Sequence, residues 1–154
     1  MNSSDFYVAL VATILPVAGF ILLRFSRLRN TVFFQETYGV VLASFGAVIK
    51  NLTTSELALI SLMAGLGEEF FFRGALIGPL GAILSSAAFA LFHAVSFSYF
   101  VLALIMGFYL AGVYQWTGNL LAPVIVHALY DFTVFLIIRS HLKRMPKTGI
   151  DLIA

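Results

Sequence analysis

Three ionisable side chains, Glu68, Glu69 and Arg73, lie within six consecutive positions of a stretch that is otherwise apolar. If the stretch crosses a membrane, each ionisable group costs roughly 2.5 to 3.5 kcal/mol, so we expect the three to face one another or a water-filled cavity. On a helix, Glu69 and Arg73 are four positions apart with the acid first, which favours a supporting ion pair. Glu68 lies about 100 degrees round the helix from Glu69, so its carboxylate faces another neighbour. The stretch is therefore a candidate site.

Two histidines, His93 and His127, lie in apolar segments further along the chain, and Asp131 follows His127 by four positions. A lone histidine in a membrane helix is more often an interhelical hydrogen-bonding group than a catalyst, and a buried ion pair can be purely structural. Two histidines together with the spare carboxylate of Glu68 favour catalysis. Asp131 shares a helix face with His127 and can accept a hydrogen bond from it.

Glu68, His93 and His127 provide the groups for two mechanisms of hydrolysis. In the first, carboxylate and imidazole activate a water by general base catalysis, and the other polar groups stabilise the oxyanion. In the second, the three side chains bind a divalent metal such as zinc, whose bound water is the nucleophile. The sequence leaves both open. It has no helix motif with two histidines around a glutamate, and the absence of cysteine excludes disulfides and thiolate catalysis.

The composition is that of an integral membrane protein. The chain has 154 residues, of which 61% are hydrophobic and 10% charged, with a mean hydropathy of +1.02. Because a helical span needs about 20 apolar residues, there is room for five or six spans. The apolar runs are continuous and do not alternate, which excludes a barrel. We predict an all-α polytopic transmembrane bundle with about five spans and one interfacial or re-entrant helix.

The spans follow from the apolar runs and their breaks. Ser55 is the expected N-cap of the second span, and Gly78-Pro79 its expected end. The segment Thr31 to Ile49 is interrupted by polar residues and is the expected interfacial or re-entrant helix. The predicted spans are Phe6 to Leu23, Glu56 to Ile77, Gly81 to Ala94, Phe97 to Trp116, and Leu120 to Ile138.

Basic residues set the expected orientation. They follow the first span and the last one, and positive charge beside spans marks the cytoplasmic face. An even number of crossings then separates the two basic ends, so residues 31–49 do not cross. We expect one domain, 1–154, with an N-terminal anchor at 6–23 and a core at about 55–138, in a bacterial-type plasma membrane and without nucleic acid as a partner. The basic residues are Arg24, Arg27, Arg29, Arg139, His141, Lys143, Arg144 and Lys147.

Small residues are spaced for helix contacts. Gly74 and Gly78, and likewise Gly107 and Ala111, are four positions apart, a spacing that lets two membrane helices approach closely. Gly65 and Gly67 are further candidates for close packing near the carboxylates.

Three motifs occur in a fixed order: Glu68-Glu69-x-x-x-Arg73, Phe89-x-x-x-His93 and His127-x-x-x-Asp131. Together they resemble the signature of the CAAX protease and bacteriocin-processing family, also called the Abi family, of intramembrane proteases. The resemblance covers roughly residues 55–138. It implies a helical membrane fold, a cavity open toward the cytoplasm, and hydrolysis of a peptide bond by a water.

The resemblance also implies roles. Glu68 and His93 resemble the pair that activates the water, His127 and the residue at 131 the oxyanion-stabilising pair, and Glu69 with Arg73 the supporting ion pair. The third motif often ends in Asn, whereas Asp131 can donate a hydrogen bond only when protonated, so it either stabilises the oxyanion in that form or orients His127. The chain is shorter than the eukaryotic prenyl-protein endopeptidases of the family, so a prenylated substrate is not implied.

We therefore predict an intramembrane endopeptidase that acts on a membrane-associated protein or peptide. Two other functions fit the same residues. A small transporter or proton relay would use buried acids and histidines for conduction, although no repeated halves are visible. A non-catalytic immunity protein would bind a peptide without cutting it.

Overall fold

The computed structural model describes residues 3–145, and this part of the chain is helical with no strand. Lys147, the last residue of the predicted basic tail, lies outside it. Five helical segments are long and apolar enough to cross a membrane, counting residues 54–92 as one. The predicted all-α bundle is confirmed. Its elements are α1 (Ser3–Phe25), η1 (Arg27–Asn30), α2 (Val32–Asn51), α3 (Thr54–Glu69), η2 (Phe70–Leu76), α4 (Ile77–Phe92), α5 (Phe97–Thr117) and α6 (Leu121–Arg144).

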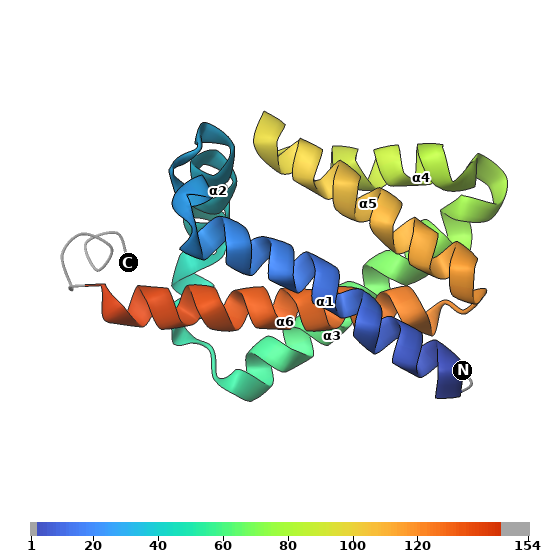
Figure 1. Cartoon of the computed structure of the whole chain (residues 1–154), viewed down its shortest axis with the longest axis horizontal. Helices are drawn as coiled ribbons and strands as arrows, with labels where there is room; N and C mark the ends of the chain where they lie inside the picture. The colour runs from blue at the N-terminus through green and yellow to red at the C-terminus, as the bar shows by residue number, and fades with distance from the viewer. Residues whose placement is uncertain (1–2, 146–154) are drawn as a thin grey trace.

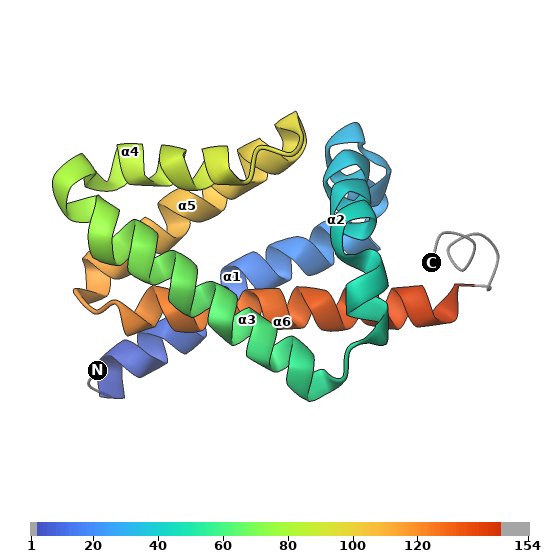
Figure 2. The same ribbon diagram turned by 180° about the vertical axis from the view of Figure 1, so that it is seen from behind.

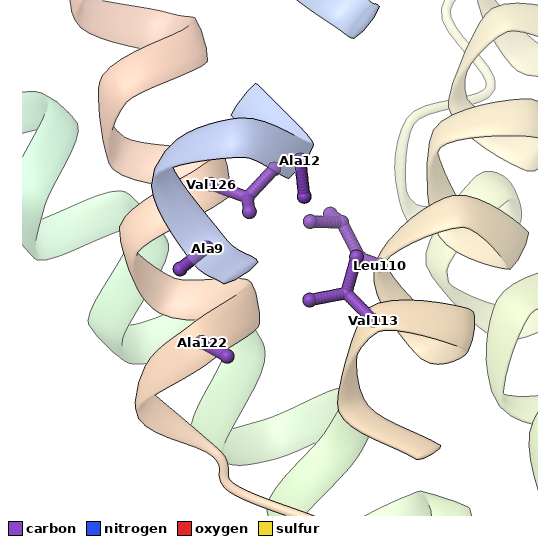
Figure 3. Close-up of a cluster of buried hydrophobic side chains, with 6 residues drawn as sticks. All are labelled: Ala9, Ala12, Leu110, Val113, Ala122 and Val126. Carbon is purple, nitrogen blue, oxygen red and sulfur yellow. The ribbon is translucent and has the colours of Figure 1, made fainter. Parts of the chain in front are cut away.

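Helix α6 lies at the centre of the bundle. In Figure 1, α1 crosses in front of it, and in Figure 2, seen from behind, α3 crosses on the other side. One buried aliphatic cluster joins α1, α5 and α6, and small side chains on α1 and α6 let these helices approach closely (Figure 3). The members of this cluster are Ala9, Ala12, Leu110, Val113, Ala122 and Val126.

The segment from α3 to α4 carries the acidic motif and then reverses direction. The N-cap of α3 is Thr53, not Ser55 as predicted, because the Thr53 side chain accepts from the Glu56 N–H while the Glu56 carboxylate accepts from the Thr53 N–H. The predicted helix end at Gly78-Pro79 is also displaced: the helical path breaks at Gly81, whose φ of 75° and ψ of 170° suit only glycine. Pro79 falls in the first turn of α4, where a helix tolerates a missing N–H.

The later predicted spans agree with the structure in position, and the last one is longer. Helix α5 matches the span predicted from Phe97 to within a residue, whereas α6 continues to Arg144, six residues beyond the predicted Ile138. Its added turns are tied to the rest of the chain, because Arg139 donates to the Leu52 carbonyl and to the Thr54 hydroxyl, both at 2.9 Å. The basic end of α6 is therefore fixed beside the junction of α2 and α3.

Helix α2 runs across its neighbours. In both views it is steeply inclined to α1 and α6 (Figures 1 and 2). By length and composition it could cross a membrane, but its hydropathy of 1.5 is the lowest of the five candidate segments. A helix inclined in this way fits a position in the interface, and the absence of a crossing by residues 31–49 stays a prediction.

Two glycines hold neighbouring helices in close contact. A Cβ on Gly65 would lie 3.0 Å from the Val124 carbonyl oxygen on α6, and a Cβ on Gly107 would lie 3.2 Å from the Ser86 carbonyl oxygen on α4. Both distances are shorter than ordinary contacts, and the atoms met are backbone atoms that cannot turn away. A Cβ on Gly67 or Gly78, in contrast, would meet nothing within 4 Å, so the predicted close contacts at these two glycines are absent. Close packing is therefore concentrated at the crossings α3–α6 and α4–α5.

We predict that Gly107→Ala destabilises the protein, while Gly112→Ala on the same helix does not. The added methyl at 107 must separate α5 from α4 by a few tenths of an ångström, at a cost of about 1 to 3 kcal/mol. At 112 a Cβ meets nothing within 4 Å, and alanine is the better helix former. Unfolding of the two variants in the same detergent compares them directly, and equal stability would contradict the close packing of α4 on α5.

Candidate active site

Four of the predicted site residues converge from three elements. Glu68 lies near the C-terminal end of α3, His93 directly follows α4, and His127 and Asp131 lie on α6. One oxygen of Glu68, Oε2, is 3.5 Å from His93 Nε2 and 4.0 Å from His127 Nε2. Asp131 Oδ2 is 3.5 Å from the same nitrogen of His127. The expected common site for an acid and two imidazoles is therefore present.

The ring of His93 is held in one orientation by Phe89. Its Nδ1 lies 2.8 Å from the Phe89 carbonyl oxygen, and the two rings are stacked with centroids 4.5 Å apart. Because a carbonyl can only accept, Nδ1 carries the hydrogen, and in the neutral ring Nε2 is left as an acceptor. This acceptor faces Glu68 across a gap longer than a hydrogen bond.

Behind these residues, the Glu69 carboxylate interacts with two side chains, those of Arg73 and His127. Its Oε1 accepts from Arg73 Nη1 at 2.9 Å and lies 2.8 Å from His127 Nδ1. Arg73 also donates from Nη2 to the Gly107 carbonyl on α5 at 2.7 Å. The predicted ion pair of Glu69 and Arg73 is present, but it is part of a longer chain that orients His127. Sequence reasoning missed this link, because Glu69 and His127 are 58 positions apart.

Exposure divides the polar residues into two groups. The side chains of Glu68, His93 and Asp131 are 32%, 24% and 23% exposed, whereas those of Glu69 and Arg73 are 0% and 1% exposed. His127, at 8%, lies between the two groups. A substrate can therefore reach Glu68, His93 and Asp131, while Glu69 and Arg73 support them from the interior.

The acidic motif continues into a π-helix, which the sequence did not predict. Phe70 to Leu76 form this element, η2, and Arg73 lies within it. The Phe72 carbonyl accepts from the buried Ser85 hydroxyl on α4 at 2.6 Å. Single π turns inside helices often occur at functional sites, because they redirect side chains without ending the helix. We attribute the direction of Arg73 toward Gly107 to this local widening.

Aromatic side chains enclose the site on the side of α4. Phe72 and Phe89 pack edge to face with centroids 5.1 Å apart, and the Arg73 guanidinium lies 4.8 Å from the Phe89 ring centre. Of the three consecutive phenylalanines of the motif, Phe70 and Phe71 are exposed, whereas Phe72 is buried. Phe89 is therefore a structural residue of the site as well as part of its motif.

Comparison with known proteins identifies a family for this chain. Residues 50–133, more than half of the chain, match the family model of the type II CAAX prenyl endopeptidase Rce1-like proteins. The chain belongs to this family. The matched region contains Glu68, Glu69, Arg73, His93, His127 and Asp131.

A relative of this chain is the uncharacterized protein YpbD of Bacillus subtilis strain 168, which is 32% identical to it over 104 residues. The alignment covers 63% of this chain and 53% of YpbD, so the chain spans about half the length of that relative. No solved structure matched. Family membership and the five long apolar helical segments together identify an integral membrane protein.

Glu68, His93 and His127 are side chains of the types that bind zinc. Zinc in proteins takes three or more nitrogen, oxygen or sulfur ligands at about 2.0 to 2.3 Å. Within residues 3–145, no group of three or more His, Asp or Glu side chains is arranged to hold a metal ion. Glu68, His93 and His127 are therefore not preformed as a metal site in this arrangement, and the metal-dependent mechanism stays a prediction to be tested.

We predict that Arg73→Met lowers the stability of this Rce1-like protein by about 3 to 5 kcal/mol, because it leaves the Glu69 carboxylate buried without its main partner. The double variant Glu69→Met/Arg73→Met should recover part of this loss, since no uncompensated charge remains. It should not recover activity, because His127 has then lost its Nδ1 partner. Unfolding in detergent measures the stabilities, and an Arg73→Met variant as stable as the wild type would contradict a structural role for the pair.

Proposed function

We propose that the chain is an intramembrane endopeptidase that hydrolyses a peptide bond of a membrane-associated protein or peptide, with a water activated by Glu68 and His93. The observation that carries this proposal is the position of Glu68 Oε2, which faces both imidazoles at a partly exposed site. This oxygen has no hydrogen-bond partner among the residues described. A buried acceptor without a partner is costly, and a water that donates to it removes that cost.

Glu68 and His93 can share one water. Both Glu68 Oε2 and the neutral His93 Nε2 are acceptors, and their separation of 3.5 Å allows a water beside them to donate to each. As the water oxygen attacks the carbonyl carbon, one of its protons passes to Glu68. A general base positioned in this way accelerates the step by about 10² to 10⁴.

His127 is placed to stabilise the intermediate. The attack moves an electron pair onto the carbonyl oxygen, and a protonated His127 donates to this oxyanion from Nε2 while Nδ1 donates to Glu69. The tetrahedral intermediate then collapses, the carbon–nitrogen bond breaks, and the leaving amine takes the proton held by Glu68. One water is consumed, and an acid and an amine are formed.

Asp131 acts on His127 in this proposal. Its Oδ2 lies 3.5 Å from the Nε2 that would donate, so it helps to fix the orientation of the His127 ring. Glu69 lies at the other ring nitrogen, Nδ1, and fixes the same orientation from the opposite side. The carboxylates of Glu69 and Asp131 both flank His127. An Asp at position 131 can therefore orient His127 without itself donating a hydrogen bond to the oxyanion.

We predict that Glu68→Gln and His93→Gln each lower the rate of proteolysis by at least about 10², while leaving the unfolding temperature nearly unchanged. Stability should be retained because both side chains are partly exposed and neither belongs to the buried Glu69 chain. Glu56→Gln, on the same helix as Glu68 but in the capping box, is the matched control and should retain activity.

The measurement is cleavage by the purified, reconstituted protein. A substrate can be found by comparing the membrane proteomes of cells that carry the wild type and the Glu68→Gln variant. Cleavage by either site variant at the wild-type rate would refute the roles assigned to Glu68 and His93.

We predict that proteolysis survives prolonged dialysis against a chelator, and that purified protein carries much less than one metal ion per chain. The reason is that, within residues 3–145, the converging acid and imidazole side chains are not arranged as a preformed metal-binding group. Elemental analysis and activity after dialysis test this together. One zinc per chain in the wild type, lost in Glu68→Gln, would instead support the metal-dependent mechanism.

A further inference from the structure

A second polar site lies at the basic end of the bundle, away from the catalytic residues. It is a pocket of about 380 Å³ between the C-terminal end of α1, the start of α2 and the last turns of α6. In Figure 1 these three segments meet at the end of the molecule opposite the N-terminus. The polar residues that line it are Arg24, Arg29, Asn30, Gln35, Tyr38 and His141.

The lining is cationic without a compensating acid. The pocket contains two arginines and no Asp or Glu. Among residues 3–145, neither arginine forms a salt bridge to a carboxylate. Arg24 is partly buried, lies 5.4 Å from the ring centre of Tyr38, and donates from Nη2 to His141 Nδ1 at 3.1 Å. A guanidinium that is held in place and lacks an anion is an attractive partner for one.

Several donors in the pocket are not used by the protein. Arg24 Nε and the Tyr38 hydroxyl are buried and have no hydrogen-bond partner within the described residues. Because Arg24 can only donate, His141 Nδ1 accepts, and in the neutral ring the hydrogen is therefore on Nε2. Asn30 and Gln35 add amide donors at the exposed rim. Phosphate oxygens are acceptors that arginine binds with short, strong hydrogen bonds, and a phosphate has enough oxygens to accept from the neutral donors as well.

We propose that this pocket binds a phosphate group, held by Arg24 and Arg29. Two sources have the same chemistry, the headgroup of an anionic phospholipid and a soluble phosphate. The surroundings favour the lipid, because Phe25 and Val32, next to the pocket, are 66% and 79% exposed and can contact acyl chains. Basic pockets between helices at the cytoplasmic side of membrane proteins are suited to anionic headgroups. The site is independent of the proposed proteolysis.

The test is binding of phosphatidylglycerol to the full chain in a neutral detergent, followed by native mass spectrometry. We expect discrete binding of one lipid, weakened about fivefold in Arg29→Gln and about 25-fold in Arg24→Gln/Arg29→Gln, from roughly fivefold for each direct hydrogen-bonding contact that is lost. Arg27→Gln is the matched control, because Arg27 lies in the same η1 segment but does not line the pocket. It should bind within about twofold of the wild type, since a neutral micelle has no surface potential.

Two further measurements distinguish the two sources of phosphate and control for misfolding of a variant. Displacement of the lipid by millimolar inorganic phosphate would assign the pocket to a soluble phosphate, and resistance to it would assign it to the lipid. Because Arg24 contacts His141, Arg29→Gln alone provides a variant at an exposed position whose folding is not in question. Wild-type binding by Arg29→Gln and the double variant, or an equal loss in Arg27→Gln, would overturn the proposal.

Discussion

The site depends on one buried oxygen, Oε1 of Glu69, which interacts with both Arg73 and His127. Removing a carboxylate from water costs several kcal/mol, and here the cost is offset only because two partners reach the same atom from two helices. Arg73 is in turn held by the Gly107 carbonyl on α5. One acid therefore connects α3, η2, α5 and α6, and it fixes the imidazole that faces the exposed Glu68. Glu68 Oε2 and His93 Nε2 lie 3.5 Å apart, and the Glu68 oxygen has no hydrogen-bond partner within the described residues, which leaves both atoms able to accept from a shared water in the proposed mechanism.

This arrangement explains why close helix packing occurs where it does. The link from Glu69 to His127 needs α3 to approach α6, and the link from Arg73 to Gly107 needs α5 to lie near η2. Gly65 allows the first approach, and Gly107, packed on Ser86 of α4, allows the second. In lipid, apolar burial gives little drive for helix association, so van der Waals contact and interhelical hydrogen bonds must hold these helices together. Here both occur at the same crossings, so packing and the polar chain support each other.

Features set by local spacing were predictable from the sequence, and features set by distant contacts were not. The pair at 69 and 73, the limits of α5 and the motifs bearing Glu68, His93 and His127 follow from spacing and hydropathy. The capping box of Thr53 and Glu56 was also readable, since a hydroxyl three positions before a glutamate is its signature. In contrast, the π-helix has no sequence signature of its own. The contact of Ser85 with the Phe72 carbonyl, thirteen positions away, and the contact of His127 with Glu69 arise only once α4 and α6 are packed.

The family match begins at residue 50 and ends at 133, so α1, most of α2 and the last turns of α6 lie outside it. These outer segments contact α6, the helix that carries His127 and Asp131. The aliphatic cluster of α1 and α5 packs on Val126, the residue before His127, and the end of α6 is tied to Arg24 through His141. Helix α6 thus carries His127 at the site and His141 at its basic end, and it is held at both places by contacts from other elements. The segments outside the family match therefore support the helix that positions His127.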